Sequence, residues 1–295
     1  MLLSEARLAF LTYLIGRKNR SVNTASTYDK ILRQFIEYTG NKLVSELSVS
    51  DIDSYADALY LRGCAPKTRR NKLATIRSFI RFLYIKELSN IRPEQVELPE
   101  IKKIEANFLT TEEAQQLVSV ITDVRDRAMI LTLLATWARI SEFLNMNLAD
   151  LYKRSIIIRE GKGGSPRTVF INEEAEEAIK KYIKEVRGDA PGPLFLNYRG
   201  TRLSREFMGK LIKRYAKEAG IAKNVTCHTL RHTGATGYIE NGGTLESANQ
   251  ILGHKSIYTT MIYLHFLNAR LHSDYDLIMP AAKYSISTKI TEVVA

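Results

Sequence analysis

The sequence has few cysteines and no long apolar runs. Its two cysteines, Cys64 and Cys227, lie far apart among the 295 residues and lack metal-ligand spacing, so we expect no disulfide framework and a reducing compartment. No apolar stretch reaches the roughly 18 residues that cross a membrane. The first residues also lack the basic region and apolar core of a signal peptide. These absences predict a cytoplasmic protein with no membrane partner.

Acidic residues are outnumbered by basic ones. The chain holds 43 Lys and Arg against 32 Asp and Glu, which gives a formal net charge of +11. An excess of this size favours a polyanionic partner, usually nucleic acid, although a generally basic protein without such a partner would share the composition. Residues 1–93 hold 16 basic against 8 acidic residues, and the remainder holds 27 against 24. The first third therefore carries +8 of the net charge of +11.

Apolar residues at helical spacing predict a small four-helix bundle in residues 1–93. The expected helices, bounded by glycines and capping residues, span 3–16, 24–39, 51–62 and 67–87. The fourth helix is strongly basic and has no acidic residue before Glu87. We expect it to contact DNA, with a merely solvated face as the alternative, through Lys67, Arg69, Arg70, Lys72, Arg77 and Arg81.

Prolines and alternating charge predict an inter-domain linker at residues 94–106, followed by a second domain with a tail at 107–295. Two β-branched segments, 155–159 and 167–171, flank a glycine-rich turn and predict a hairpin with Lys162 at its tip. The surrounding segments have helical patterns. They predict helices at 111–121, 124–136, 173–187 and 204–219. The expected fold class is mainly α with a small β-sheet.

The second domain also contains residues suited to handling a phosphate group. They occur in short motifs, in this order: Arg139, Glu142, Lys162, His228, Arg231, His232, Gly253, His254 and Tyr263. A phosphodiester repels nucleophiles, so its cleavage without a metal needs cations on the non-bridging oxygens, a nucleophile, and an acid for the leaving oxygen. Arg139 and Arg231 could clamp the phosphate, because a guanidinium donates two parallel hydrogen bonds. Tyr263 is the candidate nucleophile, but a phenol with a pKa near 10 needs a base and nearby cations.

The remaining motifs can supply those groups. His228 lies three residues before Arg231, about one helical turn, and is the candidate general acid or base. His254 can donate to a phosphate oxygen, and Gly253 before it permits the tight turn that presents it. Lys162 on its turn can protonate the leaving 5′ oxygen, although it could also be an ordinary polar turn residue.

Several assignments have alternatives at this point. His228 and His232 have the i, i+4 spacing of a helical zinc pair, but no Glu or Cys stands at a usable distance, so we expect no metal and no cofactor. His232 is interpreted as a supporting or core histidine. Tyr263 could be a core tyrosine, and Tyr258 is nearby; the spacing from the glycine–histidine motif favours Tyr263. Glu142 either orients the pocket or is a solvated or structural carboxylate.

Taken together and in order, these motifs resemble the active site of tyrosine recombinases, the family of site-specific DNA recombinases and integrases. By size and two-domain layout the chain is most similar to the Xer-type members. The resemblance implies a SAM-like core-binding domain in residues 1–93 and an α+β catalytic domain in 107–295. Two motifs depart from the family pattern. Trp137-Ala138-Arg139 stands where Gly-Leu-Arg is usual, and no second Lys follows the glycines of the turn that carries Lys162.

The resemblance also implies a reaction. Tyr263 would form a 3′-phosphotyrosyl bond at a double-stranded DNA recombination site, and strand exchange would pass through a Holliday junction without ATP or metal. A homotetramer would act on two duplexes, with the C-terminal segment docking on a neighbour; an accessory protein is a further candidate partner. The expected role is chromosome dimer resolution, which belongs to chromosome partition and cell division. An integrase or resolvase of a mobile element, or a DNA-binding relative without catalysis, are the alternatives.

Overall fold

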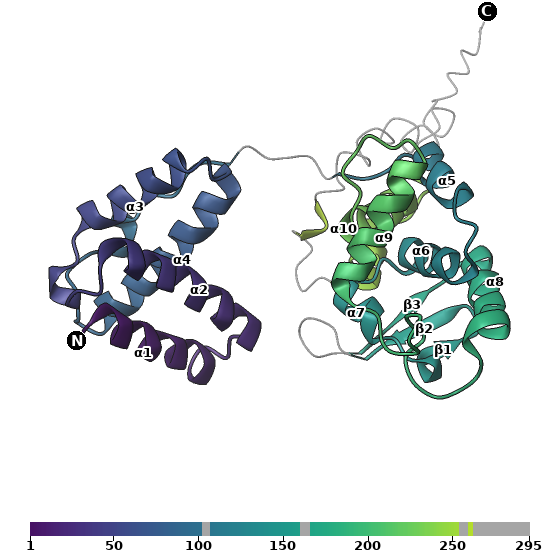
Figure 1. The fold of residues 1–295 in the computed structure, drawn as a ribbon, viewed down its shortest axis with the longest axis horizontal. Helices are drawn as coiled ribbons and strands as arrows, with labels where there is room; N and C mark the ends of the chain where they lie inside the picture. The colour runs from purple at the N-terminus through teal and green to yellow at the C-terminus, as the bar shows by residue number, and fades with distance from the viewer. Residues whose placement is uncertain (102–106, 160–165, 254–258, 262–295) are drawn as a thin grey trace, which may run out of the picture. The chain divides into compact units, whose positions relative to one another are not determined.

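A computed structural model describes residues 1–101, 107–159, 166–253 and 259–261 of the chain. It divides into two units, Met1–Ile104 and Glu105–Ala295, which are shown as ribbons in Figure 1. The predicted fold class is confirmed, since the units are mainly helical and the sheet is small. Within these ranges, no helix is both long enough and apolar enough to cross a membrane.

The first unit is the predicted bundle of four helices. They are α1 (Leu3–Gly16), α2 (Val22–Thr39), α3 (Val49–Leu61) and α4 (Pro66–Ile85). Short 3-10 turns lie at Val44–Glu46 and Pro93–Gln95. The start of α3 follows the predicted capping: the Ser48 side chain accepts from the Asp51 amide, and the Asp51 carboxylate accepts from the Ser48 amide. The helices bury one apolar core, whose aromatic members are Phe10, Phe35, Tyr55, Phe79 and Phe82.

The chain stays packed against this bundle beyond residue 93. Val96 is fully buried in the core of the first unit. Two arginines of α4 hold the segment from outside: Arg77 Nε donates to the Val96 carbonyl at 2.9 Å, and Arg70 Nη1 donates to the Pro99 carbonyl at 2.7 Å. The first part of the expected linker is therefore bound to the bundle as far as Pro99.

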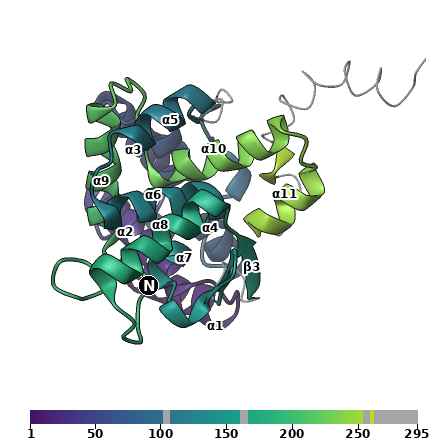
Figure 2. The same ribbon diagram turned by 90° about the vertical axis from the view of Figure 1, so that its right-hand side faces the viewer.

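The second unit is built around α6, whose side chains are buried on almost every face. Its helices are α5 (Thr111–Ser119), α6 (Val124–Thr136), α7 (Ile140–Asn145), α8 (Glu173–Tyr182, continued by a π-helical turn Ile183–Arg187), α9 (Arg205–Glu218), α10 (Cys227–Glu240) and α11 (Leu245–Leu252). Helix α6 contacts both α8 and α10, which explains its continuous apolar sequence. Figure 2 shows α11 beside α10 and close to β3, and α11 contacts both elements.

The sheet has three antiparallel strands in the order β1 (Leu151–Tyr152), β2 (Ser155–Ile158) and β3 (Arg167–Phe170). The β2–β3 pair confirms the predicted hairpin, with Ile156 opposite Val169 and both side chains in the core. Strand β1 was not predicted, because two residues are too few to show an alternating pattern. Helix α7 was not predicted either, because its six residues are too few to show a helical repeat of apolar residues. A 3-10 turn at Leu148–Asp150 connects it toward β1.

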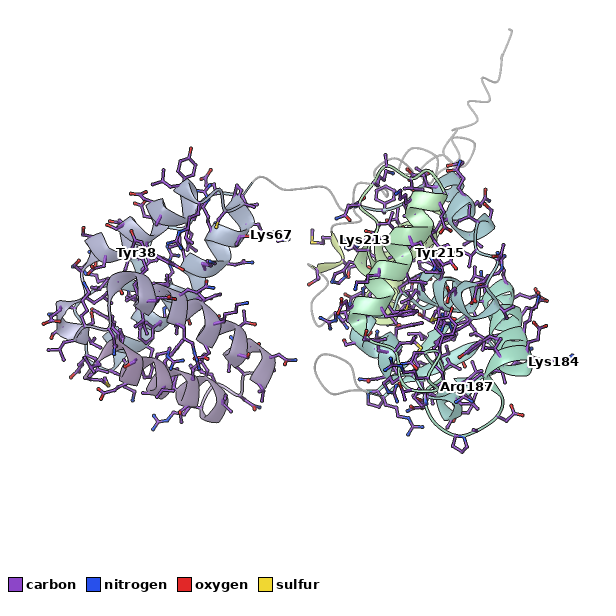
Figure 3. The ribbon with its side chains drawn as sticks, in the orientation of Figure 1. Tyr38, Lys67, Lys184, Arg187, Lys213 and Tyr215 are labelled. Atoms are coloured by element: carbon purple, nitrogen blue, oxygen red, sulfur yellow. The ribbon has the colours of Figure 1, made fainter. Side chains whose placement is uncertain are left out.

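A buried ion cluster ties α6 to α9. Asp126 is 1% exposed and accepts hydrogen bonds from Arg125, from Arg214 and from the Tyr215 hydroxyl, the last at 2.9 Å. Figure 3 labels Tyr215 on α9. Burial, and then the hydrogen bond to the Asp126 carboxylate, raise the pKa of Tyr215 to about 12. This phenol is therefore protonated at neutral pH and serves as a hydrogen-bond donor to Asp126.

Candidate active site

The first turn of α10 carries the His228–Arg231 motif. Thr226 caps the helix, because its side chain accepts from the Thr229 amide at 3.1 Å. His228, the second residue of the helix, is exposed, whereas Arg231 one turn later is only 4% exposed. The spacing predicted that both residues lie on one turn of a helix, and α10 confirms it.

Arg231 is held by two backbone carbonyls. Its Nη1 donates to the Trp137 carbonyl at 2.5 Å, and its Nη2 donates to the Leu252 carbonyl at 2.8 Å. Trp137 ends α6 in the left-handed conformation, with φ of +49°, at the position where the family usually has glycine. Its indole packs in a small apolar cluster with residues of α10 and α11, among them Ala235 and Leu252. Trp137 therefore keeps the left-handed turn at the end of α6, and its indole fills the space beside α10 and α11.

Arg139 lies at the N-cap of α7. Its Nη1 donates to Glu142 Oε1 at 2.8 Å, and its Nη2 donates to the Gly253 carbonyl at 3.2 Å. The Arg139 amide also donates to Glu142 Oε2 at 2.8 Å. Arg139 and Arg231, 92 positions apart in the sequence, thus reach the successive carbonyls of Gly253 and Leu252. The fold brings the two predicted arginines to one place.

Gly253 ends α11 in the left-handed conformation, with φ of +62°. This agrees with the predicted tight turn before His254. A Cβ atom at this position would also lie 2.9 Å from Cζ and Nε of Arg167, so the arginine approaches the glycine backbone as closely as glycine allows.

Glu142 is a buried carboxylate that links two arginines of the site. Its side chain is 2% exposed and forms ion pairs with both Arg139 and Arg167. Burial alone would raise its pKa, but the hydrogen bonds from Arg167 and from the amide and side chain of Arg139 outweigh burial and lower the pKa to about 2. Glu142 is therefore ionised at neutral pH. Its burial excludes a solvated carboxylate and agrees both with a residue that orients the pocket and with a structural carboxylate.

Arg167 was not among the residues singled out from the sequence. It is the first residue of β3, and its side chain is 14% exposed. Its sequence signal is weak, because an arginine at the start of a strand is ordinary. Only the long-range contacts, 25 positions away to Glu142 and 84 positions away to Ile251, reveal its place in the site.

The two histidines of α10 lie one above the other. The rings of His228 and His232 are stacked with centroids 6.2 Å apart. Burial lowers the pKa of His232, and the nearby His228 and Arg231 lower it further, so this ring is neutral at pH 7. Across the described ranges, no group of three or more His, Cys, Asp and Glu residues has an arrangement that could hold a metal ion.

Three of the predicted site residues, Lys162, His254 and Tyr263, lie outside the described residues. The described residues that flank the stretch with His254 are Gly253 on one side and 259–261 on the other. Gly253 precedes it at the end of α11, and Thr260 returns to the same helix, where its fully buried side chain donates to Asn249 Oδ1 at 2.8 Å. Residues 259–261 are thus anchored to α11 through Thr260.

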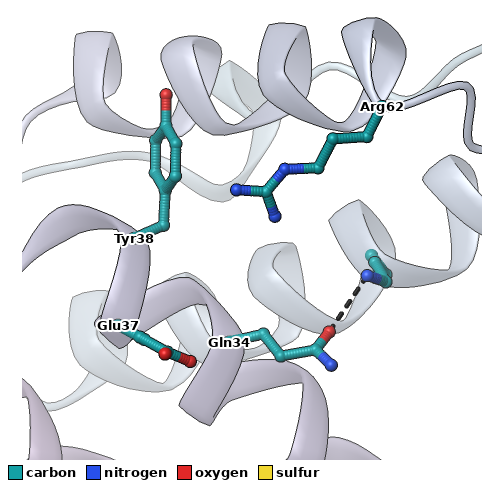
Figure 4. Close-up of a pocket in the computed structure, with 5 residues that line it drawn as sticks. Gln34, Glu37, Tyr38 and Arg62 are labelled. Atoms are coloured by element: carbon teal, nitrogen blue, oxygen red, sulfur yellow. Dashed lines mark hydrogen bonds between the residues drawn. The ribbon is translucent and has the colours of Figure 1, made fainter.

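The six basic residues of α4 have different surroundings. Lys67 is exposed at the start of the helix (Figure 3), and Arg81 is also exposed. Lys72 donates to Gln34 at 3.0 Å in a polar hollow of about 520 Å³ that also contains Arg62 (Figure 4).

The other three cations of α4 are guanidinium groups, and each of them also contacts a group within the first unit. The Arg69 guanidinium lies 5.1 Å from the centre of the Tyr60 ring. Arg70 and Arg77 bind the chain that follows the bundle, as described above. These contacts favour Lys67 and Arg81, which are exposed, and Lys72, whose ammonium has two further N–H donors beside its bond to Gln34, as the cations available to a phosphate backbone.

Comparison with known proteins places both units in one family. Residues 107–270 match the phage integrase family, and residues 8–87 match the phage integrase N-terminal SAM-like domain. The tyrosine recombinase XerD of Listeria innocua is 32% identical over 290 residues, which cover 92% of this chain and 98% of that protein. The tyrosine recombinase XerC of Pelotomaculum thermopropionicum is 33% identical over 298 residues, covering 93% and 97%.

Solved structures agree in fold. The crystal structure of XerA recombinase has 27% identity and a TM-score of 0.54, covering 94% of this chain and 99% of that one. The Tn1549 transposon integrase, solved with circular intermediate DNA, has 22% identity and a TM-score of 0.74, covering 89% and 95%. A family match over more than half of the chain, with curated relatives that align along almost its whole length, leads to one assignment: the chain belongs to the phage integrase family, the tyrosine recombinases.

Proposed function

We propose that this protein is a cytoplasmic, Xer-type site-specific DNA recombinase that resolves chromosome dimers. The observation that carries the chemistry is the convergence of Arg139 and Arg231 on successive carbonyls at the end of α11, directly before His254. Two guanidinium groups this close can bind the non-bridging oxygens of one phosphate and stabilise the charge that builds in the transition state. The curated Xer relatives support the chromosomal role.

The proposed reaction needs no cofactor. The Tyr263 oxygen attacks the scissile phosphorus, the bond to the 5′ oxygen breaks, and a 3′-phosphotyrosyl bond forms. His228 accepts the phenol proton, which its exposed position on α10 allows, and Lys162 protonates the leaving 5′ oxygen. A 5′ hydroxyl from the partner strand then reverses the step, and His254 donates to a phosphate oxygen throughout.

The remaining residues have supporting roles in this proposal. Glu142 orients Arg139, neutral His232 packs beneath His228, and Gly253 turns the chain toward His254. Lys67, Lys72 and Arg81 of α4 contribute to the grip on duplex DNA. Four protomers act on two duplexes, since strand exchange between two sites requires four cleavages.

A covalent trap tests the function. The protein is incubated with fragmented host DNA without metal and quenched with SDS, and DNA that stays attached to protein is sequenced. We expect an adduct that Tyr263→Phe abolishes; Arg231→Ala should also abolish it while leaving duplex binding mostly intact. If nicked duplexes that block religation also give no adduct although DNA is bound, the protein is a non-catalytic relative.

The recovered sequences also decide between the two recombinase roles. Attached ends from one chromosomal site support dimer resolution. Ends that map to the borders of a phage or transposon would instead identify the protein as the integrase or resolvase of a mobile element.

A further inference from the structure

Three arginines donate to three successive carbonyls at the C-terminal end of α11. Arg167 Nε donates to Ile251 at 3.1 Å, Arg231 Nη2 to Leu252 at 2.8 Å, and Arg139 Nη2 to Gly253 at 3.2 Å. Cations at a helix C-terminus are favourable because they neutralise its unpaired carbonyls. Arg139 and Arg231 have roles in the proposed chemistry, whereas Arg167 has none so far.

We propose that Arg167 is a positioning residue for recombination: it fixes Glu142 and the end of α11, and thereby leaves the Arg139 guanidinium available for the scissile phosphate. The inference rests on the function proposed above. It concerns a side chain that contacts the supporting residues of the site and not the phosphate itself.

The first part of the argument is the hydrogen bonding of Glu142. Arg167 binds this buried carboxylate with both terminal nitrogens, Nη1 to Oε1 at 3.1 Å and Nη2 to Oε2 at 2.8 Å. Because Arg167 supplies this bidentate pair, Arg139 contributes a single side-chain hydrogen bond to Glu142. The bonds from Arg139 to Glu142 and Gly253 use two of the five N–H groups of its guanidinium. The others remain to bind phosphate oxygens.

The consequence of losing Arg167 follows from the burial of Glu142. An ionised carboxylate that is 2% exposed is costly without a full set of partners. In the absence of Arg167, Arg139 is the cation of the described site still paired with it, so its guanidinium would turn both terminal nitrogens onto Glu142. It would then withdraw from Gly253 and from the phosphate position.

The second part of the argument is the contact with α11. The Arg167 guanidinium packs against Gly253, where a Cβ atom would lie 2.9 Å from Cζ, and its Nε holds the Ile251 carbonyl. These contacts fix the direction in which the chain leaves α11 toward His254. A lysine would keep the charge but could not bind the carboxylate with two nitrogens and the carbonyl with a third.

The test uses the full-length protein with Arg167→Met, Arg167→Lys and a matched control, Lys153→Met. Lys153 is exposed in the turn between β1 and β2 of the same sheet, so the control removes one positive charge from the same element. The substrate is a nicked duplex that carries the site recovered by the covalent trap. The rate of adduct formation at saturating protein and the Kd for the duplex are measured separately.

We expect Arg167→Met to lower the rate of adduct formation by about 10–100-fold while the Kd stays within about threefold of the control. Arg167→Lys should recover part of the rate, to about 3–10-fold below wild type. Since Arg167 acts through Glu142, adding Arg167→Met to Glu142→Gln should lower the rate much less than it does alone.

Three outcomes would overturn the inference: a rate for Arg167→Met equal to the control, a loss that appears in Kd alone, or full additivity with Glu142→Gln. If Arg167→Met does not fold, Arg167→Lys decides, because a rate equal to wild type would also overturn it. A wild-type protein that forms no adduct would instead refute the proposed function, and this inference with it.

Discussion

Replacing Gly234 with alanine should separate α10 from α6. Gly234 lies in α10 where the two helices cross, and an added Cβ would lie 2.2 Å from Cδ1 of Trp137 and 2.3 Å from the Leu134 carbonyl oxygen. The indole could rotate, but the carbonyl belongs to the last turn of α6 and cannot. Since ordinary contact needs about 3.4 Å or more, α10 must move by roughly 1 Å.

The loss of stability caused by this clash can be measured against a control variant in the same helix. Gly237 lies one turn further along α10 and has nothing within 4 Å of an added Cβ. Alanine at either position gains up to about 1 kcal/mol of helix propensity, so the difference between the two variants measures the steric term alone. Overpacking typically costs about 1–3 kcal/mol, and a clash with backbone belongs at the upper end. At about 2–4 °C per kcal/mol, Gly234→Ala should have a Tm roughly 6–12 °C below that of Gly237→Ala.

Activity should follow the same displacement. Arg231 precedes Gly234 by three residues, so a movement of roughly 1 Å would carry its guanidinium away from the phosphate and slow adduct formation by about 100-fold. Calorimetry and the covalent trap measure the two effects. Equal Tm values for Gly234→Ala and Gly237→Ala, with equal adduct formation, would refute the reasoning from this helix crossing.

Three further predictions concern other contacts. The pKa of Glu142 in the folded protein is about 2, below its ordinary value of 4.5. The ionised carboxylate therefore stabilises the fold above about pH 4.5. This contribution, on the order of 3 kcal/mol, is lost as the pH falls toward 2. Urea unfolding of Glu142→Gln should therefore show a flatter dependence on pH in this window; an unchanged slope would contradict the assigned ion pairs. Asp126→Ala leaves the buried Arg125 unpaired and should lower the free energy of unfolding by about 3–5 kcal/mol; a loss below about 1 kcal/mol would mean that water or other groups replace the carboxylate. Lys67→Ala should reduce the salt dependence of DNA binding by about one phosphate contact. Arg77→Ala should instead lower the Tm of the first unit and leave that salt dependence unchanged, because Arg77 binds the Val96 carbonyl. The opposite result would mean that Arg77 contacts the phosphate backbone and that Lys67 stabilises the fold.

Much of the fold could be predicted because its signals are local. Thr110 and Glu113, for example, have the spacing of a capping box at the start of α5, and each side chain accepts from the backbone amide of the other residue. The β2–β3 hairpin was visible in two β-branched runs around a glycine-rich turn. Both signals act within a few residues, so sequence spacing alone reveals them.

The contacts that assemble the site could not be predicted in this way. Arg167 meets Glu142 only because β3 and the start of α7 become neighbours in the folded chain, and no pattern near Arg167 records that. The left-handed Trp137 was recognised as a departure from the family pattern, but its packing against Gly234 depends on the crossing of α6 and α10. Sequence motifs therefore identified the reactive groups, and the tertiary structure was needed to find what holds them.

Trp137 gives the protein an optical consequence as well as a structural one. It is the sole tryptophan in the sequence, its ring lies edge-on to Tyr238 with centroids 5.1 Å apart, and its carbonyl accepts from Arg231. All indole fluorescence therefore arises from Trp137, whose carbonyl is hydrogen-bonded to Arg231, a proposed phosphate-binding residue. When a phosphate takes over that hydrogen bond, the local field at the indole changes. The intrinsic fluorescence of the unlabelled protein should thus follow the occupancy of its own active site in real time.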